Sequence, residues 1–391
     1  MKALSNRKVL LLSEGFGTGH TQAAHALAVH LRAADPRVVP KVLELGSFFH
    51  PALAPMAFAL FRRTLIKQPK LYGAIYKHYY NKPFNRLARL AIHRLFYAQT
   101  AALLRDFQPD VIVSTHPFPS AVISRMKRNG LTIPLCTVIT DYDAHSAWIQ
   151  AETDSYLVPS QEVKNALIAK GVHHHQIEAT GMPILPSFFR RPDKAAIRSR
   201  FALRAMPTVL IMGGGWGLLN EPHLLDAALE WSDHVQIILC LGSNTSTLRQ
   251  LRAEPRMNHP NIRLLGYTNH IHQLMDVADL LITKPGGMTC TEAYTKGLPM
   301  LLSKPLPGQE EGNYAHFLSL GIAEQLQSEE TIHRRFADLV SPIPSLYSYA
   351  STVQSSQANV NPVRCADAVL RLSHARSVHE PAPLFMHTST R

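Results

Sequence analysis

Apolar residues occur along this chain in short, nearly continuous runs, and segments with apolar residues at helical spacing separate one run from the next. Such runs are typical of parallel β-strands that helices cover on both faces. The pattern predicts an α/β protein with doubly wound parallel sheets. We predict strands at residues 8–12, 38–43, 111–114, 135–140, 155–158, 177–180, 208–212, 235–239, 262–265, 280–283 and 299–302.

The alternation of strands and helices is interrupted between Met182 and Pro207 by a segment that is rich in proline and charge. The chain has 391 residues, which is the length of two or three domains. We therefore predict two Rossmann-like domains and a C-terminal helix that packs back on the first domain. The predicted parts are residues 1–190 (first domain), 191–206 (hinge), 207–345 (second domain), 346–375 (C-terminal helix) and 376–391 (a disordered polar tail).

The glycine turn after the strand at residues 280–283 carries the strongest functional signal. Its sequence, TKPGGMT, places Gly286 and Gly287 before a helix that we expect to open at Thr289. Backbone N–H groups at a helix N-terminus lack intrahelical partners and can bind phosphate, and glycines let a ligand approach closely. The loops SEGFGTGH and GGGWG, each after the first strand of a half, could present N–H groups in the same way.

The polar residues around this turn have two possible roles. Thr289 and Glu292 have the spacing of a capping box, which would make both structural. The loop after the last predicted strand carries Gln309, Glu310 and Asn313, which either begin a helix or hydrogen-bond sugar hydroxyls beside a bound phosphate. Together the two loops indicate a nucleotide-sugar site.

The strings TKPGGMTCTEA and KPLPGQEEGN resemble the donor-site signature of the monogalactosyldiacylglycerol synthases and the processive diacylglycerol glucosyltransferases. The resemblance extends from about Val9 to about Ala323 through SEGFGTGH, VITDYDAHSAW, TGMPILPSF and LGYTNHIHQLM. It implies the GT-B fold, with two Rossmann-like domains facing a cleft, and an inverting transfer of sugar from a UDP-sugar to a membrane lipid. Diacylglycerol is the expected acceptor, with a glycolipid that already carries sugar and a polyprenyl-linked intermediate as alternatives, and neither cofactor nor metal is expected. The sugar is left open among glucose, galactose and N-acetylglucosamine.

The resemblance also assigns roles by position in the second half of the chain. It places the diphosphate at the glycine turn, the ribose hydroxyls at Glu292 and the sugar at Gln309 and Glu310. We expect the uracil near Gly266 and Tyr267, mostly through backbone contacts. The expected donor-binding residues are Gly213, Gly214, Gly242, Asn244, Gly266, Tyr267, Pro285, Gly286, Gly287, Thr289, Glu292, Gln309, Glu310 and Asn313.

An inverting transfer needs a general base beside the acceptor hydroxyl. His20 is the first candidate, because imidazole has a pKa near working pH and the family has a histidine at the matching position of the glycine loop. A histidine in a helix first turn without chemistry is the alternative. Asp141 and His145, which follow the strand at residues 135–140, are rivals for the catalytic role.

A net charge of +12 implies an anionic partner. The stretch from Leu45 to Arg105 contains no Asp or Glu but a quarter of the 40 Lys and Arg residues, interleaved with aromatic residues. This composition favours a peripheral contact with an anionic membrane at its cytoplasmic face, since no apolar run approaches the ~20 residues that span a bilayer. A solvated basic face is the alternative. The expected contact residues are Arg62, Arg63, Arg86, Arg89 and Arg94.

Other functional classes have weaker support. No nucleic-acid-binding module is recognisable, and the widely spaced cysteines form no zinc or disulfide framework. Gly15 and Gly17 begin like a dinucleotide fingerprint, but His20 stands where its third glycine belongs. A dinucleotide-dependent oxidoreductase and a non-catalytic nucleotide- or lipid-binding relative therefore remain as alternatives.

Overall fold

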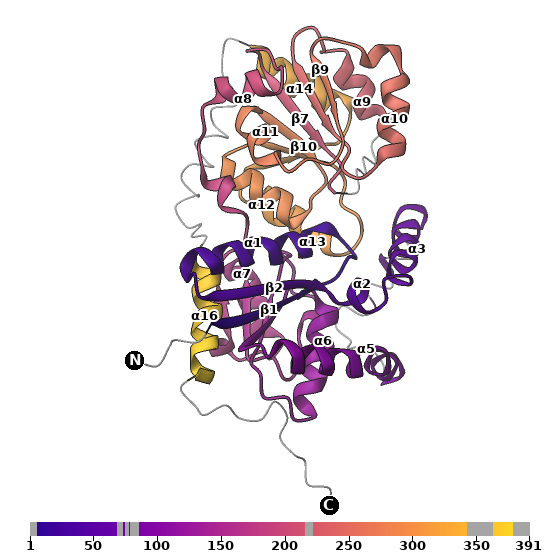
Figure 1. Cartoon of the computed structure of the whole chain (residues 1–391). Helices are drawn as coiled ribbons and strands as arrows, with labels where there is room; N and C mark the ends of the chain where they lie inside the picture. Colours follow the sequence, from indigo (N-terminus) through magenta and orange to yellow (C-terminus); the bar gives the residue numbers. More distant parts are fainter. Residues whose placement is uncertain are drawn as a thin grey trace, which may run out of the picture. The chain divides into compact units, whose positions relative to one another are not determined.

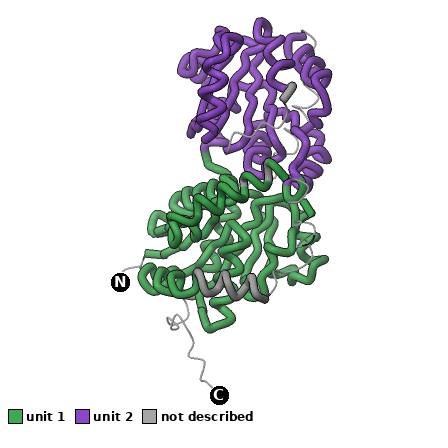
Figure 2. The backbone as a smooth tube through the Cα atoms, turned by 90° about the vertical axis from the view of Figure 1, so that its right-hand side faces the viewer, with its two compact units in different colours: residues 1–186, 307–309, 361–391 green, residues 187–306, 310–360 purple. Residues whose placement is uncertain are grey.

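The computed structural model describes residues 6–68, 73–74, 78, 86–215, 222–341 and 363–377 (Figure 1). The chain divides into two compact units (Figure 2). The first unit comprises the described residues within 1–186, 307–309 and 361–391, and the second those within 187–306 and 310–360. Trp216 and the tail from residue 378 lie outside the described residues.

The first unit is built on a six-stranded parallel sheet in the order β2-β1-β3-β4-β5-β6. Its strands are β1 (Arg7–Ser13), β2 (Val38–Glu44), β3 (Val111–Ser114), β4 (Leu135–Val138), β5 (Ser155–Val158) and β6 (Ile177–Ala179). Its helices are α1 (Thr18–Ala34), α2 (Leu45–Phe49), α3 (Ala54–Lys67), α5 (Arg86–Phe107), α6 (Pro117–Arg128), α7 (Gln161–Ala169) and α16 (Arg364–Ser377).

Helices cover both faces of this sheet. Side chains on a strand alternate between its faces, so neighbouring residues of β1 pack against different helices. Val9 and Leu11 of β1 pack in one core cluster with α1 and α16, and Figure 1 shows those two helices beside each other. Leu10 and Leu12 face the opposite way and pack with α5 and α6. A strand buried on both faces needs apolar residues at every position, which explains the continuous run at the start of the sequence.

The second unit has its own six-stranded parallel sheet, in the order β12-β11-β10-β7-β8-β9. Its strands are β7 (Thr208–Met212), β8 (Gln236–Cys240), β9 (Ile262–Leu265), β10 (Leu280–Thr283), β11 (Met300–Leu302) and β12 (Ala323–Gln325). Its helices are α8 (Lys194–Arg200), α9 (Pro222–Leu229), α10 (Thr245–Ala253), α11 (Ile271–Val277), α12 (Gly287–Lys296), α13 (Gln309–Ser319) and α14 (Glu329–Val340).

Each strand that the apolar runs predicted is present, with its ends shifted by at most a few residues. Residues 323–325 form a further strand, β12, which the sequence analysis missed. It is short, lies at the edge of its sheet and buries only Ala323 fully, so it lacks an apolar run. The prediction of two parallel α/β sheets is confirmed.

The strand orders place one switch point in each sheet. Successive strands run outward in opposite directions from the pair β1 and β3 in the first unit, and from the pair β7 and β10 in the second. In open α/β sheets, ligands bind outside the carboxyl ends of the strands at such points. The loops after β1, β3, β7 and β10 are therefore where each unit should carry its chemistry.

Candidate active site

The first unit gathers histidines and aromatic rings at its switch point. His20 lies in the first turn of α1, and His116 follows β3. The Nδ1 atom of His20 is 2.6 Å from Thr140 Oγ1. Its ring makes edge contacts with His116 and Trp148, at 4.8 and 5.9 Å between ring centroids. The segment that carries Asp141 and His145 is thus held beside the His20 ring at its two ends.

Burial sets the protonation of both histidines. His20 is 8% exposed, and burial lowers its pKa to about 4, while a hydrogen bond with the Thr115 backbone acts in the opposite direction. Burial and the nearby His20 also hold the pKa of His116 well below its usual value. His116 Nδ1 accepts a hydrogen bond from the Phe118 amide at 3.1 Å. Both rings are neutral near pH 7, so His20 is in the form that can accept a proton.

Asp141 and His145, the rival bases, are both buried. The Nδ1 atom of His145 accepts a hydrogen bond from the Ala147 amide at 3.0 Å and so caps the short turn at Ser146–Trp148. His145 therefore has a structural role as the cap of the turn that contains Trp148. The catalytic roles of His20, Asp141 and His145 stay predictions.

Sequence reasoning missed His116 and its stacking partner Phe16. The Phe16 ring stacks on His116 at 5.9 Å between centroids. Phe16 also meets Phe58 and Phe61 of α3 edge-on, at 4.9 and 5.2 Å. The signal for His116 was its place two residues after a buried strand, at the same sheet edge as His20, but recognising it requires the strand order.

Two carboxylates anchor the glycine loop of the first unit. Buried Glu14 accepts hydrogen bonds from the Gly15 amide at 3.1 Å and the Gly46 amide at 2.8 Å. Glu44 accepts hydrogen bonds from Thr21 Oγ1 at 2.7 Å and Ser47 Oγ at 3.1 Å. These bonds tie the loop and the start of α1 to α2. Burial raises the pKa of the Glu14 carboxyl, although both amides lower it.

Helix α3 has two apolar faces. One face carries Phe58 and Phe61, whose rings contact Phe16 of the glycine loop. The other face carries Met56 and Leu60 and continues from Leu53, the N-cap; Leu53, Met56 and Leu60 are 62, 69 and 67% exposed. The exposed residues have helical spacing, and the exposed Arg63 and Lys67 continue the same stripe. The side chains of Arg62, Arg86, Arg89 and Arg94 lie outside the described residues. None of the helices in the described ranges has the length and apolar character needed to cross a bilayer.

In the second unit, α12 begins at Gly287 with Gly286 as its N-cap and without a side-chain cap. The expected opening at Thr289 and the capping box are therefore wrong, because the helix starts two residues earlier and Glu292 lies beyond the first turn. The Cys290 amide, which bonds Gly286 O at 3.0 Å, is the first to bond back into the helix. The Gly287, Met288 and Thr289 amides thus form the N-terminal group expected to bind an anion.

Glu292 is buried inside this helix at 8% exposure. Burial raises its pKa to about 8, so the carboxyl is mostly protonated at neutral pH. A buried carboxyl group that is not a helix cap is costly unless a ligand or an internal partner uses it. The sequence analysis gave Glu292 two possible roles, helix capping and ribose binding. Glu292 does not cap the helix, so ribose binding stays as the prediction.

The other expected donor residues form a strip along the carboxyl edge of the second sheet. A Cβ atom on Gly266 would lie 3.7 Å from Gly242 O, and one on Gly242 would lie 2.5 Å from Gly215 O. The loops after β7, β8 and β9 are therefore in contact. Tyr267 is 66% exposed at one end of the strip, and Asn244 caps α10 through Thr247 N at 3.3 Å.

Residues of α13 belong to the same edge of the sheet. Glu310 is buried and accepts hydrogen bonds from Lys284 Nζ at 2.8 Å and from the Leu306 amide at 3.0 Å. Asn313 is also buried, and Gln309 is half-buried. Each carboxylate oxygen can accept a second hydrogen bond, so the sugar-binding role expected of Glu310 stays a prediction.

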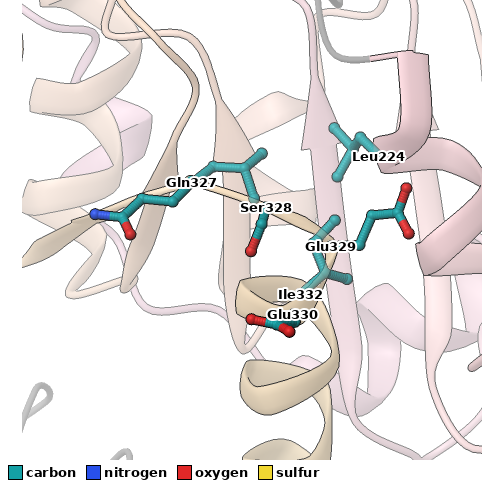
Figure 3. A pocket seen from close by; sticks show the side chains of 7 residues that line it. Leu224, Gln327, Ser328, Glu329, Glu330 and Ile332 are labelled. Carbon is teal, nitrogen blue, oxygen red and sulfur yellow. The ribbon is translucent and has the colours of Figure 1, made fainter.

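A separate hollow of about 510 Å³ lies where α14 begins, beyond the end of β12 (Figure 3). It contains none of the expected site residues, and its carboxylates Glu329 and Glu330 would repel a diphosphate. Within the described ranges, no cluster of three or more His, Cys, Asp or Glu side chains could hold a metal ion. The hollow is therefore not our candidate for the donor site.

Solved structures share this fold. MurG of Acinetobacter baumannii superposes with a TM-score of 0.58 at 16% sequence identity, over 93% of this chain and 99% of MurG. A UDP-GlcNAc 2-epimerase from Neisseria meningitidis, solved with UDP-GlcNAc, gives 0.60 at 14% identity, over 94% of this chain and 100% of the epimerase. Identities this low show the fold alone. The class defined by the fold is GT-B, as predicted.

Two family models match successive parts of the chain: Monogalactosyldiacylglycerol (MGDG) synthase at residues 20–184 and Glycosyltransferase family 28 C-terminal domain at residues 208–359. The processive diacylglycerol beta-glucosyltransferase of Bacillus subtilis (strain 168) is 30% identical over 371 residues, covering 93% of both chains. The chain belongs to this family of lipid glycosyltransferases. The family predicted from the donor-site strings is confirmed, and the oxidoreductase alternative is wrong.

Proposed function

We propose that the protein transfers glucose from UDP-glucose to the free hydroxyl group of diacylglycerol, with inversion at the anomeric carbon. The observation that carries this proposal is the edge of the second sheet, where the amides at the start of α12 lie on the same helix as the buried carboxyl of Glu292. A helix terminus that can bind an anion, together with a carboxyl group that can hydrogen-bond the two ribose hydroxyls, fits a nucleoside diphosphate. Glucose and diacylglycerol are chosen because the 30% identical relative is named for both.

The donor is proposed to bind along this strip in the second unit. The diphosphate takes the amides after Pro285, the ribose hydroxyls take Glu292, and the uracil lies near Gly266 and Tyr267. Gln309 and Asn313, with Glu310, surround the sugar. We expect the transfer to need no cofactor or metal, since the amides and helix terminus can offset the charge of the leaving UDP.

The acceptor is proposed to bind at the switch point of the first unit. His20 takes the proton from the attacking hydroxyl, and Asp141 is the second candidate for that role. The half-buried Phe16 ring, stacked on His116, offers apolar surface to a lipid. The bond between the anomeric carbon and the diphosphate breaks as the acceptor oxygen attacks, and the electron pair leaves with UDP.

A panel of donors tests the proposed function. The purified protein is incubated with diacylglycerol vesicles and UDP-glucose, UDP-galactose or UDP-N-acetylglucosamine, and the lipids are analysed by mass spectrometry. Glucosyl-diacylglycerol should be the main product. A product formed mainly from another donor would change the sugar assignment, and UDP binding without any glycolipid would favour a non-catalytic relative.

We further propose that the exposed stripe of α3 attaches the protein to the cytoplasmic face of an anionic membrane. Replacing Met56 and Leu60 with aspartate should lower binding to phosphatidylglycerol vesicles about tenfold or more, because it removes two apolar anchors and adds negative charge. Sedimentation with vesicles measures the loss, and raised salt should weaken wild-type binding.

The control for this prediction is Val340→Asp, which changes a partly exposed apolar residue on α14 in the other unit. It should leave vesicle binding unchanged, and the α3 variant should keep its affinity for UDP. Equal vesicle binding by the α3 variant and the wild type would assign the stripe to another use.

A further inference from the structure

Lys284 is a cation on the donor strip to which the sequence analysis gave no role. It is the first residue after β10, and its Nζ atom forms an ion pair with Glu310 at 2.8 Å. Its side chain is 27% exposed, whereas that of Glu310 is 9% exposed. The ammonium group therefore lies at the boundary between the protein interior and the edge where a ligand would bind.

The stem of Lys284 crosses the glycine loop that follows β7. Met212 and Thr283 are paired at the ends of β7 and β10, so the two loops leave the sheet side by side. A Cβ atom at Gly214 would lie 3.0 Å from Lys284 Cε, and Gly214 has a φ of +69°. A larger residue at position 214 would press against the lysine stem and would be strained in this backbone conformation, which glycine adopts freely.

Glu310 fixes the ammonium group in place. One oxygen of the carboxylate accepts the bond from Lys284, and the other accepts the bond from the Leu306 amide at 3.0 Å. An ammonium group has three N–H donors, so the bond to Glu310 leaves donor capacity on the partly exposed side. A cation held in this way, between a glycine loop and a helix N-terminus, is arranged for an anionic ligand.

We propose that Lys284 binds the diphosphate of the donor and that Glu310 positions it for this contact. The proposal rests on the proposed function and adds a residue to it. Lys284 exchanges no proton in the reaction. Its charge offsets the negative charge that grows on the β-phosphate oxygen as the bond to the anomeric carbon breaks.

Calorimetry with UDP and with uridine tests this role, because the two ligands differ only in the diphosphate. Lys284→Met retains most of the stem that packs against Gly214 and removes the charge. The variant should bind UDP about tenfold more weakly, the scale of a charge-assisted hydrogen bond at a partly exposed site, and bind uridine as the wild type does. The salt dependence of UDP binding should also become weaker.

Lys194→Met is the matched control. Lys194 is exposed at the start of α8 and lies near Asp279, which bonds Thr208 N at the opposite end of the sheet. The Lys194→Met substitution should leave UDP affinity unchanged. If Lys284→Met does not bind uridine, the double variant Lys284→Met with Glu310→Gln, which leaves no unpaired charge, provides the same comparison.

The outcomes separate this inference from the proposed function. UDP affinity within twofold of wild type in the folded Lys284 variant would overturn the role of Lys284. A wild-type protein that binds neither UDP nor UDP-glucose would overturn the proposed function itself.

Discussion

Replacing His20 with alanine is expected to lower the turnover number about 100-fold or more without weakening UDP binding, the usual scale for the loss of a general base. The neutral, buried ring has the form that accepts a proton. Because the pKa of His20 is about 4, turnover should not vary with pH on its account above about pH 5. It should fall as the pH drops through 4 and the ring becomes charged.

Steady-state rates with saturating UDP-glucose and diacylglycerol vesicles measure this effect, and calorimetry checks UDP binding. His25→Ala is the matched control, since His25 is exposed on the same helix, α1. If Asp141→Asn abolishes turnover while His20→Ala leaves it intact, the base is Asp141. His20 would then serve to position the segment that begins at Thr140.

Replacing Glu292 with glutamine is expected to change both stability and donor binding. In the folded protein the pKa of Glu292 is about 8, against an ordinary value of 4.5. Between these two pH values the folded state holds one more proton than the unfolded state, so stability decreases as pH rises. Above pH 8 the ionised, buried carboxylate lowers the free energy of unfolding by at most about 5 kcal/mol. The Glu292→Gln protein should therefore be more stable than the wild type at pH 8.5, with a smaller difference near pH 5.

The same substitution should weaken UDP binding about tenfold or more, because an amide cannot accept both ribose hydroxyls as a carboxylate does. Wild-type UDP affinity should rise between pH 6 and pH 8, since binding favours the ionised carboxylate and releases a proton. Calorimetry in two buffers of different ionisation enthalpy measures that proton. Equal UDP affinity in the two proteins, at every pH, would remove Glu292 from the ribose site.

The sequence was sufficient for the sheets because their strands are buried on both faces and so appear as apolar runs. It was not sufficient for β12, which is an edge strand with one buried residue. It also placed the start of α12 too late, because Thr289 and Glu292 imitate a capping box, whereas the glycines begin the helix. The capping-box pattern is defined by local residue spacing alone, so it cannot show where the helix begins in the fold.

The residues that the sequence analysis missed depend on tertiary contacts. His116 meets His20 only because β3 pairs with β1. Lys284 meets Glu310 across a separation of 26 residues, which contains a helix, a strand and a loop. No local pattern connects the two residues. The glycine loops were visible in the sequence, but the side chains that cross them were not.

The anomeric configuration of the product tests the central claim most directly. The wild-type protein is supplied with UDP-α-D-glucose carrying a ¹³C label and with vesicles of phosphatidylglycerol and diacylglycerol. The lipid product is then examined by NMR and mass spectrometry. We expect labelled β-glucosyl-diacylglycerol, formed by inverting transfer. An α-linked product, or consumption of the donor by epimerisation or hydrolysis with no labelled lipid, would contradict it.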